Sequence, residues 1–181
     1  MSSALLVIDM QQGFDDLYWG KRNNPQCETN VAALIAAYRK KGQAVIHVQH
    51  MSVEPQSPLR PNQPGNDFKP EALPIAGEKV FSKTVNSAFI GTDLEKYLHA
   101  NGIDELVICG LTTDHCVSTS TRMAGNLGFK TYLVSDASAT FNRKGIDGRE
   151  WSADEIHQSA LASLNDEFAE VLSTEAVLKL F

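Results

Sequence analysis

The sequence contains little cysteine, and the cysteines that it has form no structural pattern. Among 181 residues there are three, Cys27, Cys109 and Cys116. Their odd number and their spacing match neither a disulfide framework nor a Cys-x-x-Cys metal or redox pair. We therefore expect a reduced, cytoplasmic protein whose core needs no covalent cross-links.

Excess positive charge, long apolar runs and phosphate-binding glycine motifs are also absent. The chain carries 16 Lys+Arg against 22 Asp+Glu, a formal net charge of −6, whereas nucleic-acid-binding proteins present a basic surface. The apolar run from Ala4 to Ile8 ends at Asp9, too early for a signal peptide, and no run approaches the ~20 residues that span a bilayer. No Gly-x-Gly-x-x-Gly or P-loop occurs. The expected partner is a small-molecule substrate, with no nucleic acid, membrane or cofactor.

What the sequence does contain is an alternation of short apolar runs with helix-period segments, which is typical of a parallel sheet covered on both faces. At this length the prior is one domain, which we assign to residues 1–181. We predict an α/β fold with three α/β/α layers and a doubly wound, six-stranded parallel sheet. The predicted strands are Ala4–Met10, Ala44–His50, Val80–Lys83, Glu105–Gly110, Lys130–Ser135 and Phe168–Leu172.

Helix signals lie between these strands. Residues 31–38 follow the i, i+3, i+4, i+7 spacing of an amphipathic helix that ends near Gly42. Two capping boxes, Thr92-x-x-Glu95 and Ser152-x-x-Glu155, predict two further helix starts. A fourth helix is expected from about residue 114 to 127, closed by Gly128.

One segment breaks the alternation. Residues 51–78 hold six of the seven prolines and show neither strand nor helix periodicity. Loops of this length in compact domains are functional lids, interfaces or disordered segments. A lid or subunit contact and an inert polyproline-like strap both remain open.

Three side chains that could act in catalysis lie at or after predicted strand ends, where open α/β sheets bind ligands. Asp9 follows the first strand, Lys83 ends the third, and Cys116 follows the fourth at a predicted helix start. A helix N-terminus lowers the pKa of a thiol, so we expect Cys116 to favour the thiolate. If the third strand lies at the sheet edge, Lys83 starts roughly 10 Å from Asp9, and the loop after it must bend inward.

The same residues carry a family resemblance. Leu-Leu-Val-Ile-Asp-Met-Gln (5–11), Lys83-x-x-Asn-Ser-Ala-Phe89, Leu-Val-Ile-Cys-Gly-Leu-Thr-Thr-Asp-His-Cys-Val (106–117) and Leu-Val-Ser-Asp-Ala (133–137) together resemble the isochorismatase-like cysteine hydrolases. The resemblance runs from about residue 4 to 178. It implies a six-stranded parallel sheet, a non-proline cis peptide between Leu111 and Thr112, and a homo-oligomer, either dimer or tetramer.

By motif position, the resemblance implies a catalytic triad of Asp9, Lys83 and Cys116. It implies a cofactor-free hydrolase that cleaves a small amide or ureide C–N bond through a Cys116 thioester. Asp9 would exchange protons with the thiol and the leaving amine. The backbone N–H groups of Thr112 and Cys116 would form the oxyanion hole. Cys27 and Cys109 are interpreted as packing residues.

Aromatic and polar residues near these motifs are candidates for the substrate pocket, with loop packing as the alternative. The candidates are Phe14, Trp19, Asn86, Phe89, His115 and Phe141.

The histidines do not form a metal-binding pattern. His47 and His50 lie three apart on a predicted strand and so point to opposite faces, which prevents them from chelating one ion. The Asp-x-His arrangement of nicotinamidases is missing here, and we predict no metal. His99 and His157 are expected on helix surfaces.

Two alternative functions remain. One is isochorismate hydrolysis, a vinyl-ether cleavage that resembles another branch of the family and does not require the cysteine. The other is a non-enzymatic thiol redox sensor, for which Cys109 would be a poorly placed resolving cysteine because it lies inside a predicted strand.

Overall fold

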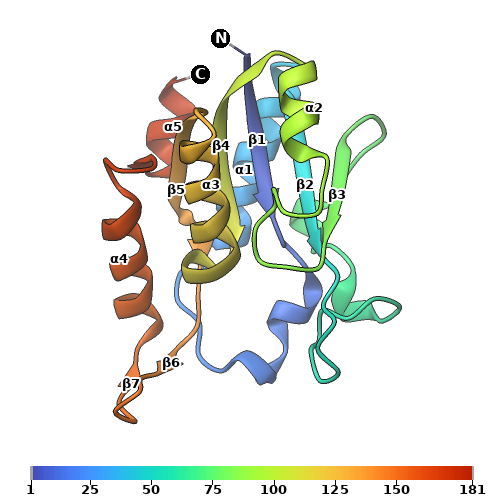
Figure 1. Ribbon diagram of the computed structural model, residues 1–181. Helices are drawn as coiled ribbons and strands as arrows, with labels where there is room; N and C mark the ends of the chain where they lie inside the picture. The colour runs from blue at the N-terminus through green and yellow to red at the C-terminus, as the bar shows by residue number, and fades with distance from the viewer. Residues whose placement is uncertain (1, 181) are drawn as a thin grey trace.

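The computed structural model of the protein describes residues 2–180 and has one large parallel sheet at its centre (Figure 1). All neighbouring strands in this sheet run parallel. In spatial order they are β3 (Lys79–Lys83), β2 (Ala44–His50), β1 (Ser2–Ile8), β4 (Ile103–Leu111), β5 (Lys130–Ala139) and β8 (Glu170–Leu172). The predicted six-stranded parallel sheet is therefore confirmed.

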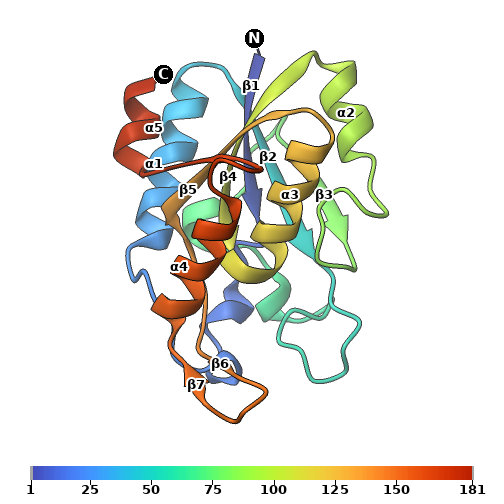
Figure 2. The same ribbon diagram turned by 60° about the vertical axis from the view of Figure 1, so that its left-hand side comes forward.

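Helices cover both faces of the sheet (Figure 2). Helices α1 (Cys27–Lys40) and α5 (Thr174–Leu180) pack on one face, and their buried side chains belong to one apolar cluster. Helices α2 (Leu94–Ala100), α3 (Ser118–Asn126) and α4 (Ala153–Leu164) contribute to a second cluster on the other face. The two clusters are the two interfaces of the predicted three-layer architecture.

Strand β1 shows why the sequence favours this arrangement. Leu5 and Val7 belong to the α1 cluster, whereas Leu6 and Ile8 belong to the opposite one. All four side chains are fully buried, and burial of each contributes about 1.5–3 kcal/mol. A strand that is apolar on both faces is stable only at the centre of a covered sheet.

The helix starts were predicted with mixed success. Ser152 and Glu155 form the expected capping box of α4. The capping box at Thr92 is wrong: α2 begins at Leu94, and the Thr92 hydroxyl donates a 2.6 Å hydrogen bond back to the Ala88 carbonyl. Helix α5 and a short antiparallel hairpin, β6 (Arg143–Lys144) and β7 (Glu150–Trp151), have no counterpart in the prediction.

The proline-rich segment, residues 51–78, packs closely against the chain that follows β1. A Cβ atom on Gly13 would lie 2.8 Å from the carbonyl oxygens of Gly65 and Pro58, so the two backbones touch directly. The Asn66 side chain donates to the backbone oxygens of His50 and Leu59 at 2.9 and 2.7 Å. The segment is thus tied to the carboxyl end of β2.

None of the helices among residues 2–180 is long and apolar enough to cross a membrane.

Candidate active site

The candidate site lies at the carboxyl ends of β1 and β4, the neighbouring strands between which the sheet order reverses. Asp9 follows β1 directly and is fully buried. Its φ of +50° lies in the left-handed region, which non-glycine residues rarely adopt. The backbone N–H of Asp9 donates to the Val48 carbonyl at 3.0 Å, which fixes this turn against β2.

The two carboxylate oxygens of Asp9 have different surroundings. Oδ2 accepts a 2.6 Å hydrogen bond from the Lys83 ammonium in an ion pair whose side chains are both fully buried. Oδ1 is buried and has no hydrogen-bond partner among residues 2–180. An unpaired buried carboxylate oxygen is costly, and such atoms concentrate where function requires a free acceptor.

Lys83 reaches Asp9 from the sheet edge by its side chain. It is the last residue of the edge strand β3 and pairs in register with His50 of β2. The long aliphatic stem spans the end of β2, so the expected inward bend of the following loop is not what brings the ammonium to Asp9. That expectation was wrong because it took no account of the length of the lysine side chain.

Cys116 lies in a π-helical turn, Thr113–Val117, between β4 and α3. The Leu111–Thr112 peptide bond before this turn is cis, at the position that the resemblance implied. The Cys116 side chain is almost buried, with 7% of its surface exposed, and its Sγ lies 3.8 Å from Asn86 Oδ1. Ligand-type atoms of Asp9, His50 and Cys116 all lie within 4.8 Å of one another. The structure therefore brings Asp9, Lys83 and Cys116 together.

The thiol does not have the lowered pKa that we expected. Burial raises the pKa of Cys116 well above its usual value, the Asp9 carboxylate raises it further, and the Lys83 ammonium opposes both. The effect of a helix start is outweighed because the thiol is removed from water. The resting group is a neutral thiol that needs a base.

Two hydrogen-bonded anchors hold the turn that carries Cys116. The Thr113 hydroxyl and His157 Nδ1 lie 2.8 Å apart, and Asp114 accepts from Arg143 Nε at 2.8 Å and from the Thr140 hydroxyl. The prediction that His157 lies on a helix surface is wrong: the ring is 3% exposed and points from α4 into the protein. His99, by contrast, has an exposed side chain on α2, as expected.

His50 is the site residue that sequence reasoning missed. It ends β2, the strand between those of Asp9 and Lys83, and its Nδ1 lies 3.1 Å from Lys83 Nζ. The sequence could have indicated its position, because a residue at the end of β2 lies next to the residue that follows β1. The prediction considered His50 only as a partner of His47, which instead contacts Glu78 at 2.9 Å.

Asp9, His50 and Cys116 are of the residue types that bind divalent cations, but their arrangement does not fit one. The Lys83 ammonium already contacts Asp9 Oδ2 and His50 Nδ1. A metal ion would have to displace this buried cation or be placed against it. Lysine supplies the positive charge of the site.

The predicted pocket residues fall into separate groups. Phe14, Trp19 and Phe141 form one aromatic cluster, with ring centroids 5.0–6.1 Å apart. Asn86 lies beside the thiol, as described above. Phe89 packs in the core at 6.2 Å from the ring of Phe129, and the half-exposed His115 side chain lies 3.4 Å from Asp114.

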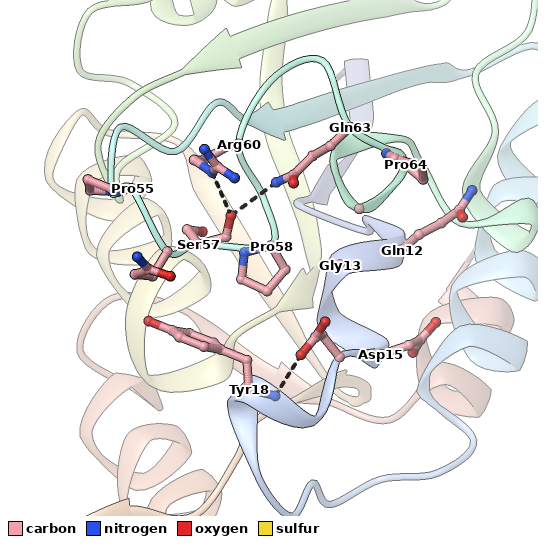
Figure 3. Close-up of a pocket in the computed structure, with 13 residues that line it drawn as sticks. Gln12, Gly13, Asp15, Tyr18, Pro55, Ser57, Pro58, Arg60, Gln63 and Pro64 are labelled. Carbon is pink, nitrogen blue, oxygen red and sulfur yellow. Dashed lines mark hydrogen bonds between the residues drawn. The ribbon is translucent and has the colours of Figure 1, made fainter.

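A pocket of about 460 Å³ opens between the turns after β1 and the proline-rich segment (Figure 3). Tyr18 and Asp15 lie on one side of it, and Ser57, Pro58 and Arg60 lie on the other. Asp9, Lys83 and Cys116 are not among its lining residues. The hollow is therefore adjacent to the same end of the sheet but does not itself contain the reactive group.

Comparison with known proteins gives a consistent result. The isochorismatase domain model matches residues 3–176. The isochorismatase family protein YrdC of Bacillus subtilis is 47% identical over 178 residues, covering 98% of this chain and 95% of that protein. Maleamate amidohydrolase of Pseudomonas putida is 32% identical over 151 residues, covering 74% of this chain and 70% of that protein.

A solved structure agrees with these relatives. The crystal structure of an isochorismatase-family protein from Chromobacterium violaceum superimposes with a TM-score of 0.95 at 49% identity, covering 98% of this chain and 92% of that one. The fold, the position of the buried Asp9, Lys83 and Cys116, and these similarities lead to one conclusion: the chain belongs to the isochorismatase family of hydrolases.

Proposed function

We propose that the protein hydrolyses a C–N bond of a small amide or ureide through a thioester on Cys116. The observation that carries this proposal is the free Asp9 Oδ1, a buried proton acceptor without a partner in residues 2–180, next to a neutral thiol. A thiol whose pKa is raised by burial is a nucleophile only if a neighbouring base takes its proton in the same step. Asp9 is the base that we propose for this step.

In the first half of the reaction, Asp9 Oδ1 accepts the Cys116 proton while Sγ bonds to the substrate carbonyl carbon. The carbonyl electron pair moves onto oxygen, where the N–H groups of Thr112 and Cys116 would stabilise it; one such donor contributes ~3–4 kcal/mol where measured. The pair then returns, the C–N bond breaks, and the leaving nitrogen takes the proton from Asp9.

In the second half, water attacks the thioester carbon and gives a proton to Asp9. The C–S bond breaks, the acid product leaves, and the proton returns from Asp9 to Sγ. The Lys83 side chain would stabilise each negative charge that forms on Asp9 or Cys116. No redox change or further reactant is needed.

The substrate class is supported by a relative and by the site. The Pseudomonas putida relative is named an amidohydrolase, and its match spans 74% of this chain. Asn86 Oδ1 beside the thiol offers a polar contact to a substrate amide. We propose a compact, uncharged carboxamide or carbamoyl group at the reacting end.

The two alternatives lack comparable support. Vinyl-ether hydrolysis makes no use of Cys116, yet this thiol lies beside a free base. A redox sensor needs an accessible thiolate and a partner thiol, but Cys116 is nearly buried and Cys109 is fully buried with a strongly raised pKa.

The test is a screen of carboxamides, carbamoyl compounds and isochorismate with wild-type protein and Cys116→Ala. We expect turnover of a C–N substrate to fall by at least about 10³-fold in Cys116→Ala. Mass spectrometry of wild type with a slow substrate should show an acyl group on Cys116. Cys27→Ala, which alters a buried cysteine at the start of α1, is the matched control and should keep turnover. Full activity of Cys116→Ala would overturn the mechanism.

A further inference from the structure

His50 lies beside the buried ion pair of Asp9 and Lys83. Strand β2 separates β3 from β1, and its last residue, His50, is in register with Lys83. The Lys83 ammonium is 3.1 Å from His50 Nδ1 and 2.6 Å from Asp9 Oδ2. The histidine thus contacts Lys83 at the point where this side chain crosses the sheet.

The chemistry of the contact determines the protonation state of the ring. An ammonium group has only donors, so Nδ1 must accept and the ring must be neutral. A neutral ring that accepts at Nδ1 carries its proton on Nε2. The contact with Lys83 therefore selects one tautomer of His50.

The backbone of His50 is held as firmly as its ring. Gln11, two residues after Asp9, accepts from the His50 N–H at 2.8 Å and donates to the His50 carbonyl at 3.0 Å. Both contacts come from one side chain, which links the ends of β1 and β2. The backbone of His50 cannot shift away from Lys83 without breaking this link.

Two of the three N–H groups of Lys83 have acceptors within hydrogen-bond distance. Asp9 Oδ2 takes one, His50 Nδ1 takes one, and the third is left for Cys116, whose pKa the ammonium lowers. A lysine side chain has many rotamers, and a single contact to Asp9 would not select the one that faces the thiol.

We propose that His50 is a positioning residue for Lys83: its neutral Nδ1 holds the ammonium in the orientation that serves Asp9 and Cys116 together. The role rests on the proposed function, since it concerns the same nucleophile, but it can be measured without any substrate.

Protonation of His50 removes this support. A protonated ring cannot accept from Lys83 and places a second cation 3.1 Å from the first. The charged and titratable groups that face the ring are Lys83, Asp9 and Cys116. Burial and the Lys83 charge lower the pKa of His50 below its usual value, and Asp9 opposes them. His50 therefore accepts from Lys83 at neutral pH. This contact is lost as the pH falls through the lowered pKa of His50.

The experiment measures the rate at which iodoacetamide alkylates Cys116, followed by mass spectrometry of the Cys116 peptide from about pH 5 to about pH 8. His50→Leu removes the acceptor and keeps an apolar side chain of similar bulk. His50→Asn keeps an acceptor near the place of Nδ1 that does not titrate. His99→Asn, on the exposed face of α2, is the matched control. Circular dichroism establishes that each variant is folded.

We expect His50→Leu to slow alkylation at neutral pH by about tenfold or more, because a hydrogen bond to a charged group is lost. His50→Asn should recover most of the rate, and its loss of rate at acid pH should begin lower than in wild type. An unchanged rate in His50→Leu, or an identical acid limb in His50→Asn, overturns the proposal.

The outcome separates this inference from the proposed function. If alkylation depends on His50 but no C–N substrate is turned over, the positioning role stands and the hydrolase proposal fails. If a C–N substrate is turned over with equal kcat in wild type and His50→Leu, the hydrolase proposal stands and the positioning role fails. If the hydrolase proposal and the positioning role are both correct, His50→Leu lowers kcat far more than it changes KM.

Discussion

Asp9 combines two properties that are unfavourable for stability and useful for chemistry. Its backbone has a φ of +50°, and one of its two buried oxygens has no hydrogen-bond partner within residues 2–180. Each feature costs on the order of 1–3 kcal/mol. A protein retains such costs where the strained residue acts, and here the strained residue lies beside the Cys116 thiol.

Replacement of Asp9 by Asn should separate chemistry from folding. Asn tolerates a positive φ and can still accept from Lys83, but it cannot take a proton from Cys116. We expect turnover and Cys116 alkylation at neutral pH to fall by about 10²–10⁴-fold. Urea unfolding should show a modest loss of stability, smaller than the ~3–5 kcal/mol typical when a buried ion pair loses one partner.

The exposed Asp104, near the amino end of β4, provides the control Asp104→Asn, which should leave both measurements unchanged. If Cys116 in Asp9→Asn is alkylated at the same rate as in the wild-type protein, the carboxylate is not the base.

Individual site residues were predictable to different degrees. Asp9, Lys83 and Cys116 stand at predicted strand ends, so sequence order was enough to place them on the same edge of the sheet. The contact of His50 with Lys83 depends on the register of β2 with β3, and the burial of His157 depends on its contact with Thr113. Neither is encoded locally. The raised pKa of Cys116 follows from burial, which a helix-start argument does not consider.

At the level of elements, the approach of β1 to β4 depends on a glycine. Gly110 has a φ of +122°, and a Cβ there would lie 2.0 Å from the carbonyl oxygen of Ile8, immediately before Asp9. Any side chain would push β4 away from β1 at the point where the two carry the base and the nucleophile turn.

We therefore expect Gly110→Ala to lower the free energy of unfolding by more than about 2 kcal/mol, because strain in the left-handed region adds to the backbone clash. Residual folded protein should also lose Cys116 alkylation. The matched control is Gly42→Ala. Gly42 has a φ of +66° but open space around it, so this variant should lose only about 1–2 kcal/mol of unfolding free energy. Equal urea midpoints for the two variants would show that the clash is relieved by a small shift.

The strands were easier to predict than the segments between them. The predicted bounds of β2 agree with the structure, and those of β4 differ by one or two residues, because apolar runs that are buried on both faces have few alternatives. The helix start at Thr92 was misjudged because its hydroxyl bonds backward to Ala88, a choice that depends on the preceding turn. The path of residues 51–78 is set by backbone contact with Gly13 and by hydrogen bonds from the Asn66 side chain rather than by periodicity.

At the level of the whole molecule, buried histidines couple stability to pH. Burial lowers the pKa of His47 and of His157 below 6.5, despite opposing contributions from nearby carboxylates. As the pH falls below about 6.5, the unfolded chain takes up protons that the folded chain does not, so the free energy of unfolding decreases. Hydrogen bonds from Arg22 and Arg39 help to hold the pKa of Glu28 and Glu78 at about 2, which adds a further decrease between about pH 4.5 and about pH 2.

Urea unfolding at about pH 7.5, 5.5 and 2.5 should show this stepwise loss. His157→Gln should flatten the first step, and His99→Gln should not. A free energy of unfolding that is the same at about pH 7.5 and about pH 5.5 would contradict the predicted role of the buried histidines.

The aromatic cluster after β1 has an optical consequence. The protein has two tryptophans: Trp19 lies at 5.0 Å from the Phe14 ring, and Trp151 lies under Arg149 in the β6–β7 hairpin. Both lie in segments beyond the carboxyl ends of the strands, and the central sheet has none. Intrinsic fluorescence therefore reports on the loops around the candidate site, whereas unfolding of the sheet has to be followed by circular dichroism. A compound that shifts the emission without changing the dichroism spectrum binds near these loops, which offers a direct way to find ligands for a hydrolase whose substrate is sought.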